Sequence, residues 1–268
     1  MNSPHRAPGT AVLAVAAGCL LASCSSAGAS PSATPGTTGP TAPGHNVGTQ
    51  VDVPLTGALQ HLQLRDSTGR QRSLGDFRGK VLVLAPGMTL CQDSCPIDTA
   101  GLVATARQVD RAGLRDKVEF VTVTVDPRRD TPAQLAAYRK LFKPAPANWL
   151  TLTGSQHDVM ALWHTLGVYV KKVKGDQQPP PKNWRTGQPL RYDVDHSDEV
   201  FFFDAHQHDR FVLEGMPHVN HSAKVPASLL AFMGKQGRAN VAHPMGPVWT
   251  VPQAVHVVSW LTGERIPI

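Results

Sequence analysis

A continuous apolar run, Val81–Ala85, ends a few residues before a pair of cysteines, Cys91 and Cys95. An apolar run without alternation predicts a strand that is buried on both faces of a sheet. Beyond the cysteines, apolar residues recur at helical spacing from Ile97 to about Arg111. The chain is therefore expected to pass from a central strand into a helix, with two thiols at the junction.

The same alternation continues downstream. A β-branched strand is expected at 118–125, and after it a helix capped by Thr131 with Pro132 at its first position. A short strand is expected at 149–152, followed by another helix that begins at Ser155. Two further strands, Val200–Phe203 and Phe211–Leu213, form an expected hairpin. The pattern predicts an α/β protein with a central mixed sheet flanked by helices. With a cysteine pair after an early strand, it indicates a thioredoxin-like fold.

The first 23 residues read as a targeting segment. Arg6 supplies a positive charge, and the apolar stretch Ala11–Leu21 is too short to cross a bilayer. The segment ends Leu-Ala-Ser-Cys24, which resembles a bacterial lipobox in which Cys24 is lipidated. We expect a lipoprotein anchored to the outer face of the cytoplasmic membrane; a plain secretory signal is the alternative. Cys19 would leave with the signal peptide.

Residues 24–50 are rich in Ser, Gly, Pro, Thr and Ala and carry no Asp, Glu, Lys or Arg. Such a composition cannot bury a core, so a tether spanning about 25–30 Å is expected. Residues 51–268 are expected to fold, with a core at about 60–213 and a His-rich C-terminal extension at 214–268. A hairpin around the turn at 66–69 and a proline-rich surface loop at 174–191 are also predicted.

The chain carries 26 Lys and Arg against 20 Asp and Glu, a net charge of +6 over 268 residues. The basic residues are dispersed and no nucleic-acid recognition motif accompanies them, so nucleic acid is not an expected partner.

Two cysteines separated by three residues can cycle between dithiol and disulfide, hold a soft metal such as Cu(I), or form an inert disulfide. Cys91 is expected just before a helix N-terminus, where N–H groups and the helix dipole stabilise a thiolate. A metal would need a further ligand. His196, expected on a loop before the strand at Val200, is the candidate, although such a histidine taken alone is more often solvated.

Four segments resemble the Sco/SenC family of thioredoxin-like copper proteins. They are Asp76–Lys80, the CxxxCP motif Cys91–Pro96, the VDPxRDTP motif within Val123–Pro132 and the DHS motif Asp195–Ser197. The resemblance implies Cys91, Cys95 and His196 as copper ligands, for Cu(I) and in some states Cu(II). It further implies a copper chaperone, not an enzyme, that assembles the CuA centre in subunit II of cytochrome c oxidase and is recycled by a thiol–disulfide reductant.

Several residues near these motifs have open roles. Asp126 could hydrogen-bond near the site as an outer group, or simply satisfy a turn. Met88 stands where the family commonly has other residues and could lend a thioether, although packing is the simpler role. The histidines of the C-terminal third could form a second copper patch or a solvated surface; they are His206, His208, His218, His221, His243 and His256.

Two other functions use the same cysteines. A thiol–disulfide reductase acting on CuA cysteines or other exported thiols would not need His196. A thiol peroxidase is disfavoured: Thr89 lies two residues before Cys91, and the proline and threonine pattern expected around a peroxidatic cysteine is missing.

Overall fold

The computed structural model describes residues 39–175, 177–219 and 223–268. The predicted signal peptide, Cys24 and the first part of the predicted tether lie outside the described residues. The last two residues of that tether, Thr49 and Gln50, belong to strand β1 (Thr49–Pro54), which pairs with β10. Within the described residues, no helix is both long and apolar enough to cross a membrane.

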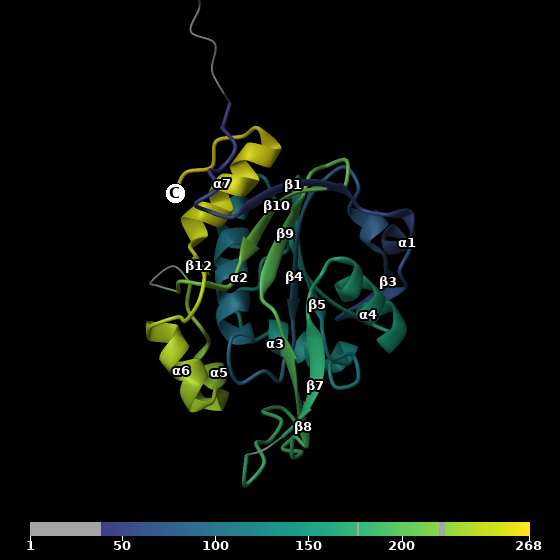
Figure 1. Cartoon of the computed structure of the whole chain (residues 1–268), viewed down its shortest axis with the longest axis vertical. Helices are drawn as coiled ribbons and strands as arrows, with labels where there is room; N and C mark the ends of the chain where they lie inside the picture. The colour runs from purple at the N-terminus through teal and green to yellow at the C-terminus, as the bar shows by residue number, and fades with distance from the viewer. Residues whose placement is uncertain (1–38, 176, 220–222) are drawn as a thin grey trace, which may run out of the picture. The chain divides into compact units, whose positions relative to one another are not determined.

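An eight-stranded mixed sheet forms the centre of the described part of the chain, in the order β1-β10-β9-β4-β5-β6-β2-β3 (Figure 1). Strands β4, β5 and β6 run parallel, and the remaining neighbours pair antiparallel. Besides β1, the strands are β2 Leu64–Asp66, β3 Gln71–Arg72, β4 Val81–Gly87, β5 Val118–Thr124, β6 Trp149–Gly154, β9 Glu199–Phe203 and β10 His208–Glu214. The predicted α/β, thioredoxin-like fold with a mixed sheet is confirmed, as are both hairpins.

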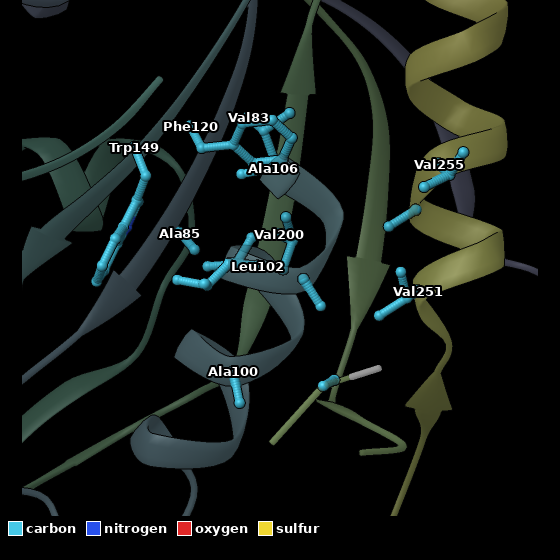
Figure 2. Close-up of a cluster of buried hydrophobic side chains, with 14 of the residues drawn as sticks. Val83, Ala85, Ala100, Leu102, Ala106, Phe120, Trp149, Val200, Val251 and Val255 are labelled. Carbon is cyan, nitrogen blue, oxygen red and sulfur yellow. The ribbon is translucent and has the colours of Figure 1, made fainter. Parts of the chain in front are cut away.

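Strand β4 is apolar on both faces because each face covers a separate core. Val83 and Ala85 point into one cluster with residues of α2 (Cys95–Arg111) and α7 (Val251–Thr262), part of which Figure 2 shows. Leu82 and Leu84 point into the other cluster. The alternation within one uninterrupted apolar run thus places β4 at the centre of the sheet, and the cysteine loop at its carboxyl end.

The other helices divide between these two faces (Figure 1). Helix α3 begins where predicted, since the Thr131 hydroxyl accepts a hydrogen bond from the Gln134 amide and Pro132 occupies the first turn. It ends at Arg139, so Leu141 and Phe142 follow the helix. The bounds of the remaining helices of the core are α1 Gly57–Gln60, the 3-10 helix η1 Leu74–Phe77, α3 Pro132–Arg139 and α4 Gln156–Thr165.

The C-terminal extension packs on the same core, as expected for a segment without a core of its own. Val251 and Val255 of α7 join the cluster around α2 (Figure 2). Two helices precede α7, namely α5 Ala227–Phe232 and α6 Lys235–Ala242, and a short parallel pair joins β11 Met216–Pro217 to β12 Val248–Trp249. Helix α6 was not predicted, because its sequence is mostly polar.

The proline-rich segment predicted as a loop at 174–191 forms no helix or named strand at its described residues 175 and 177–191, and an antiparallel ribbon bounds it. Strands β7 (Val170–Lys174) and β8 (Tyr192–His196) pair with each other, with Val170 opposite His196. The prediction that His196 lies on a loop is therefore wrong: it is the last residue of a strand.

Candidate metal centre

The two cysteines lie at the start of α2, where Cys95 is the first helical residue and Pro96 follows in the first turn. Proline fits this place because its missing N–H would have no partner in the helix. The Cys91 Sγ accepts hydrogen bonds from the Asp93 amide at 3.3 Å and from the Cys95 amide at 3.4 Å. Both cysteines are buried free thiols. The helix N-terminus thus aims its amides at Cys91, as predicted.

The Asp93 amide lowers the pKa of Cys91, as expected at a helix start, but other interactions outweigh it. The hydrogen bond with Cys95, together with burial, raises the pKa of Cys91 well above its ordinary value. Burial raises the pKa of Cys95, despite hydrogen bonds from Cys91 and from the Met88 amide. Both groups are therefore thiols at neutral pH, and a metal must displace their protons to bind.

His196 meets Cys95 directly: its Nε2 lies 3.1 Å from the Cys95 Sγ. On the other side of the ring, Nδ1 lies 3.0 Å from the Ser197 carbonyl and 3.4 Å from an Asp198 carboxylate oxygen. A carbonyl can only accept, so Nδ1 carries the proton and Nε2 turns its lone pair to the sulfur. The imidazole side chain is only 3% exposed.

The structure brings the three predicted ligands into one chain of contacts, Cys91 to Cys95 to His196. Cys91 and His196, together with Met88, line a cavity of about 500 Å³. Nevertheless, no three Cys, His, Asp or Glu side chains converge into a ready-made metal site among residues 39–175, 177–219 and 223–268.

The comparison with known families covers this whole region. The model of the family described as SCO1/SenC matches residues 56–230, more than half of the chain. The chain belongs to the SCO1/SenC family.

Two curated relatives show how similar this chain is to other proteins in sequence. The human mitochondrial SCO2 homolog is 33% identical over 141 residues, 53% of this chain and 48% of that protein. A SCO2-like protein of Rickettsia felis is 26% identical over 145 residues, covering 53% of this chain and 62% of the relative. The chain thus spans about half the length of the human relative.

Solved structures with a similar fold include two Sco proteins. One is Bradyrhizobium japonicum ScoI with copper bound, with a TM-score of 0.47, 22% identity and coverage of 70% of this chain and 99% of that one. The other is a SCO1/SenC family lipoprotein from Bacillus anthracis, with a TM-score of 0.46, 24% identity and coverage of 65% and 90%.

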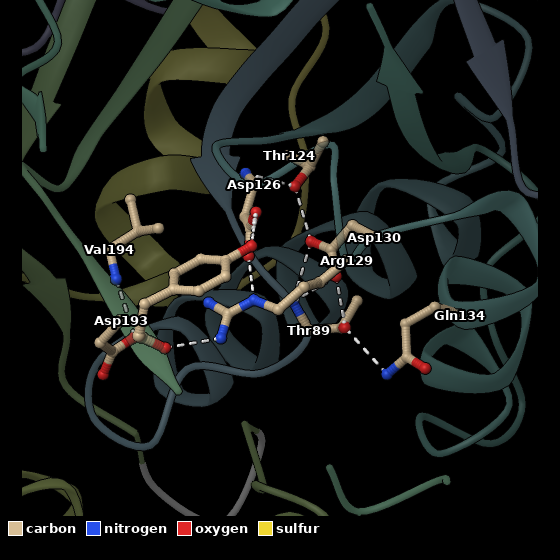
Figure 3. A network of polar contacts seen from close by, with 9 residues as sticks. Thr89, Thr124, Asp126, Arg129, Asp130, Gln134, Asp193 and Val194 are labelled. Atoms are coloured by element: carbon tan, nitrogen blue, oxygen red, sulfur yellow. Dashed lines mark hydrogen bonds and ion pairs between the residues drawn. The ribbon is translucent and has the colours of Figure 1, made fainter. Parts of the chain in front are cut away.

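Asp126 makes none of its observed hydrogen bonds to the predicted ligands; its carboxylate accepts from the Tyr192 hydroxyl at 3.0 Å and pairs with Arg129. Arg129 also donates to the Tyr192 carbonyl at 2.7 Å, and its guanidinium lies 3.9 Å from the centre of the Tyr192 ring. Tyr192 opens the strand that ends at His196. Asp126 and Arg129, which Figure 3 shows paired, therefore fasten the start of strand β8, the strand that ends at His196.

A second buried carboxylate holds the loop between β4 and the cysteines (Figure 3). Asp130 accepts hydrogen bonds from the Thr89 amide at 3.1 Å, the Thr89 hydroxyl at 2.5 Å and the Thr124 hydroxyl at 2.6 Å. Burial raises the pKa of Asp130 to about 6, because these hydrogen bonds offset only part of the desolvation. The RDTP part of the family motif thus supports Thr89, two residues before Cys91.

Sequence reasoning missed a carboxylate pair behind the ligands. Asp198 follows the DHS motif, and its carboxylate accepts a hydrogen bond from Ser94 at 3.3 Å. Burial, together with the Asp198 charge, raises the pKa of Asp98 well above its ordinary value. The available signals were the position of Asp98, three residues after Cys95 in a helix, and of Asp198, two after His196.

Met88 is buried and packs in the same apolar cluster as both cysteines, which agrees with the packing role. Two of the histidines predicted as a possible second patch have separate partners. His208 lies 2.9 Å from an Asp52 carboxylate oxygen, and His256 lies 3.1 Å from the Thr41 carbonyl. His221 lies outside the described residues.

Proposed function

We propose that this chain is a copper metallochaperone that binds Cu(I) through the Sγ atoms of Cys91 and Cys95 and the Nε2 of His196. The contact of 3.1 Å between the Cys95 sulfur and a lone pair of His196 is the observation that carries the proposal. Two thiolates and an imidazole form a soft, low-coordinate ligand set that suits Cu(I). The fixed tautomer of His196 supports it, because the ring presents an acceptor and not a proton to the site.

Membership of the SCO1/SenC family supports a recipient, the CuA site in subunit II of cytochrome c oxidase. Lipidation at Cys24 would place the protein at the outer face of the bacterial cytoplasmic membrane, where that subunit exposes its copper site. The cavity beside Cys91 and His196 supplies a path for the metal to leave.

Redox chemistry would control release. An external disulfide can oxidise the copper-bound thiolates of Cys91 and Cys95, which lose two electrons and form one disulfide, while the oxidant takes up those electrons and two protons from solvent and becomes a dithiol. That disulfide removes two of the three copper ligands. A thiol–disulfide reductant reverses the step and restores the binding form.

A competition titration tests this proposal. The reduced protein is titrated anaerobically with Cu(I) against a chromophoric chelator, beside the variants His196→Ala and Cys91→Ser. His164→Ala is the matched control, because His164 is exposed on α4. We expect one Cu(I) per wild-type chain, an affinity loss of about tenfold or more for His196→Ala, and no change for the control.

Equal affinity of wild type and His196→Ala would refute the three-ligand site. Absent binding with rapid disulfide exchange would favour a thiol–disulfide reductase.

A further inference from the structure

The C-terminal extension touches the loop between the two cysteines. We call helices α5 and α6 and their link, residues 227–242, the clamp; most of it follows the end of the family match at residue 230. The clamp makes two hydrogen bonds with Gln92. The Gly234 amide donates to the Gln92 carbonyl at 2.9 Å, and the Gln92 side chain donates to the Phe232 carbonyl at 3.0 Å. Figure 1 shows α5 and α6 beside one end of α2.

Asn240 of the clamp holds the next loop residue. Its Nδ2 donates to the Asp93 carboxylate at 2.8 Å, while its Oδ1 accepts from Gln236 at 2.9 Å. The second hydrogen bond orients the amide, since Gln236 Nε2 can only donate and so fixes the oxygen on that side. Asn240 is 3% exposed, in a helix whose polar side chains are otherwise mostly at the surface. An oriented, buried amide therefore fixes Asp93.

Gly237 shows how closely the clamp fits. A Cβ at this position would lie 2.3 Å from the Gln92 carbonyl oxygen and 2.9 Å from the Asp93 Cα. Both neighbours are backbone atoms, which cannot move without moving the loop. Helix α6 thus approaches the loop as closely as only glycine allows.

These contacts reach the Cys91 thiol through the backbone amide of Asp93. The Asp93 amide, which belongs to the residue that Asn240 and Gly237 hold, donates to the Cys91 Sγ at 3.3 Å. We propose that Asn240 and Gly237 are positioning residues that hold the Cys91–Cys95 loop in its dithiol arrangement and so set the balance between dithiol and disulfide. The consequence for copper affinity rests on the proposed function; the redox balance does not.

The equilibrium between the dithiol and the disulfide is measured without metal. Protein dithiol and oxidised dithiothreitol exchange to protein disulfide and reduced dithiothreitol, so that two protons and two electrons pass from the protein to the reagent. The clamp contacts exist with the dithiol loop, and removing them stabilises the disulfide relative to the dithiol. For Asn240→Ala we expect the equilibrium constant to shift toward disulfide by about threefold to tenfold, which corresponds to a potential about 15–30 mV more negative.

A charge-preserving swap separates positioning from general damage. In Asp93→Asn with Asn240→Asp, the amide and carboxylate exchange places and the hydrogen bond is retained in the reverse sense. We expect Asn240→Asp alone, which sets two carboxylates against each other, to show the shift in full, and the double variant to restore at least half of the logarithmic shift. Glu264→Gln is the control, since Glu264 of the extension pairs with Lys117 at 2.8 Å and is distant in the chain from the clamp.

The redox titration decides the inference whether or not copper binds. Equilibrium constants equal to the control in Asn240→Ala and Gly237→Ala, with native circular dichroism, would overturn it. So would a swap variant no closer to wild type than Asn240→Asp alone. If Gly237→Ala does not fold, Asn240→Ala and the swap decide alone. Failure of wild type to bind Cu(I) would instead overturn the proposed function and leave this result standing.

Discussion

Asp198 positions His196 through the ring nitrogen that faces away from Cys95. Its carboxylate oxygen lies 3.4 Å from the His196 Nδ1, opposite the nitrogen that faces Cys95. A carboxylate behind a ligating imidazole fixes its tautomer and raises its basicity. We expect Asp198→Asn to weaken Cu(I) binding by about tenfold, measured by chelator competition. Asp116→Asn, an exposed carboxylate on a turn, is the matched control. Unchanged affinity in Asp198→Asn would show that Ser197 alone orients the ring.

Asp209 gives the fold a pH dependence of known sign. Burial raises the pKa of Asp209 to about 7, although the Phe211 and Phe202 amides donate to it, and one of its carboxylate oxygens has no partner. In the unfolded chain the pKa is about 3.9, so between about pH 4 and 7 the folded state binds more protons. This carboxylate therefore stabilises the fold least above pH 7, and its contribution falls as the pH rises through that window.

Asp209→Asn removes this titration. We expect the variant to gain about 1–2 kcal/mol in free energy of unfolding at pH 8 relative to wild type, and close to nothing at pH 4. Urea unfolding at the two pH values measures the difference. A gain of equal size at both values would show that packing, and not ionisation, is responsible.

Single residues of the site were predictable to different degrees. Pro96 placed the helix start correctly, because proline prefers the first turn, and thereby placed both cysteines. His196 could be chosen only through its motif, since no periodicity connects it to Cys95 across 101 residues. The raised pKa of Cys91 could not be predicted, because it depends on burial and on a contact with a second thiol.

Among the elements, the β7–β8 ribbon carries His196 and is fastened at its opposite end. Arg129 and Asp126, both largely buried, join Tyr192 of β8 to the turn after β5. We expect Arg129→Met to cost about 3–5 kcal/mol, since it leaves the buried Asp126 carboxylate unpaired. Hydrogen exchange of the β8 amides should quicken more than exchange in β9.

The control for this change is Arg115→Met, which breaks an exposed ion pair with Asp110 and should cost about 1 kcal/mol or less. Adding Asp126→Asn to Arg129→Met should recover part of the loss, because the unpaired charge is removed. Equal exchange rates in β8 and β9 of Arg129→Met would mean that the ribbon does not depend on this ion pair.

The elements that sequence reasoning missed share a cause. Lys171, Lys172 and Lys174 alternate poorly with apolar residues, so β7 gives no strand signal, and its pairing with β8 stabilises it. Helix α6 lacks an apolar stripe because it packs through Gly237 and Asn240 on backbone atoms and a carboxylate. Pairing and close backbone packing are long-range properties that local periodicity does not contain.

At the scale of the whole described fold, the C-terminal extension completes the core on the α2 face. Val255 of α7 is buried with Val83 and Leu102 in one cluster (Figure 2). We expect Val255→Ala to lower the free energy of unfolding by about 1–3 kcal/mol and to shift one cooperative transition. Far-UV circular dichroism and the labelling rate of Cys95 should change together in denaturant. Two separate transitions would show that the extension folds independently of the sheet.

In the proposed site, Cys91, Cys95 and His196 hold one copper ion together. X-ray absorption spectroscopy of the Cu(I)-loaded, reduced protein counts those ligands directly. We predict two sulfur scatterers and one nitrogen per copper, with the outer-shell scattering of an imidazole, and loss of the imidazole signal in His196→Ala. A wild-type spectrum with sulfur ligands only, or one that His196→Ala leaves unchanged, would contradict the account.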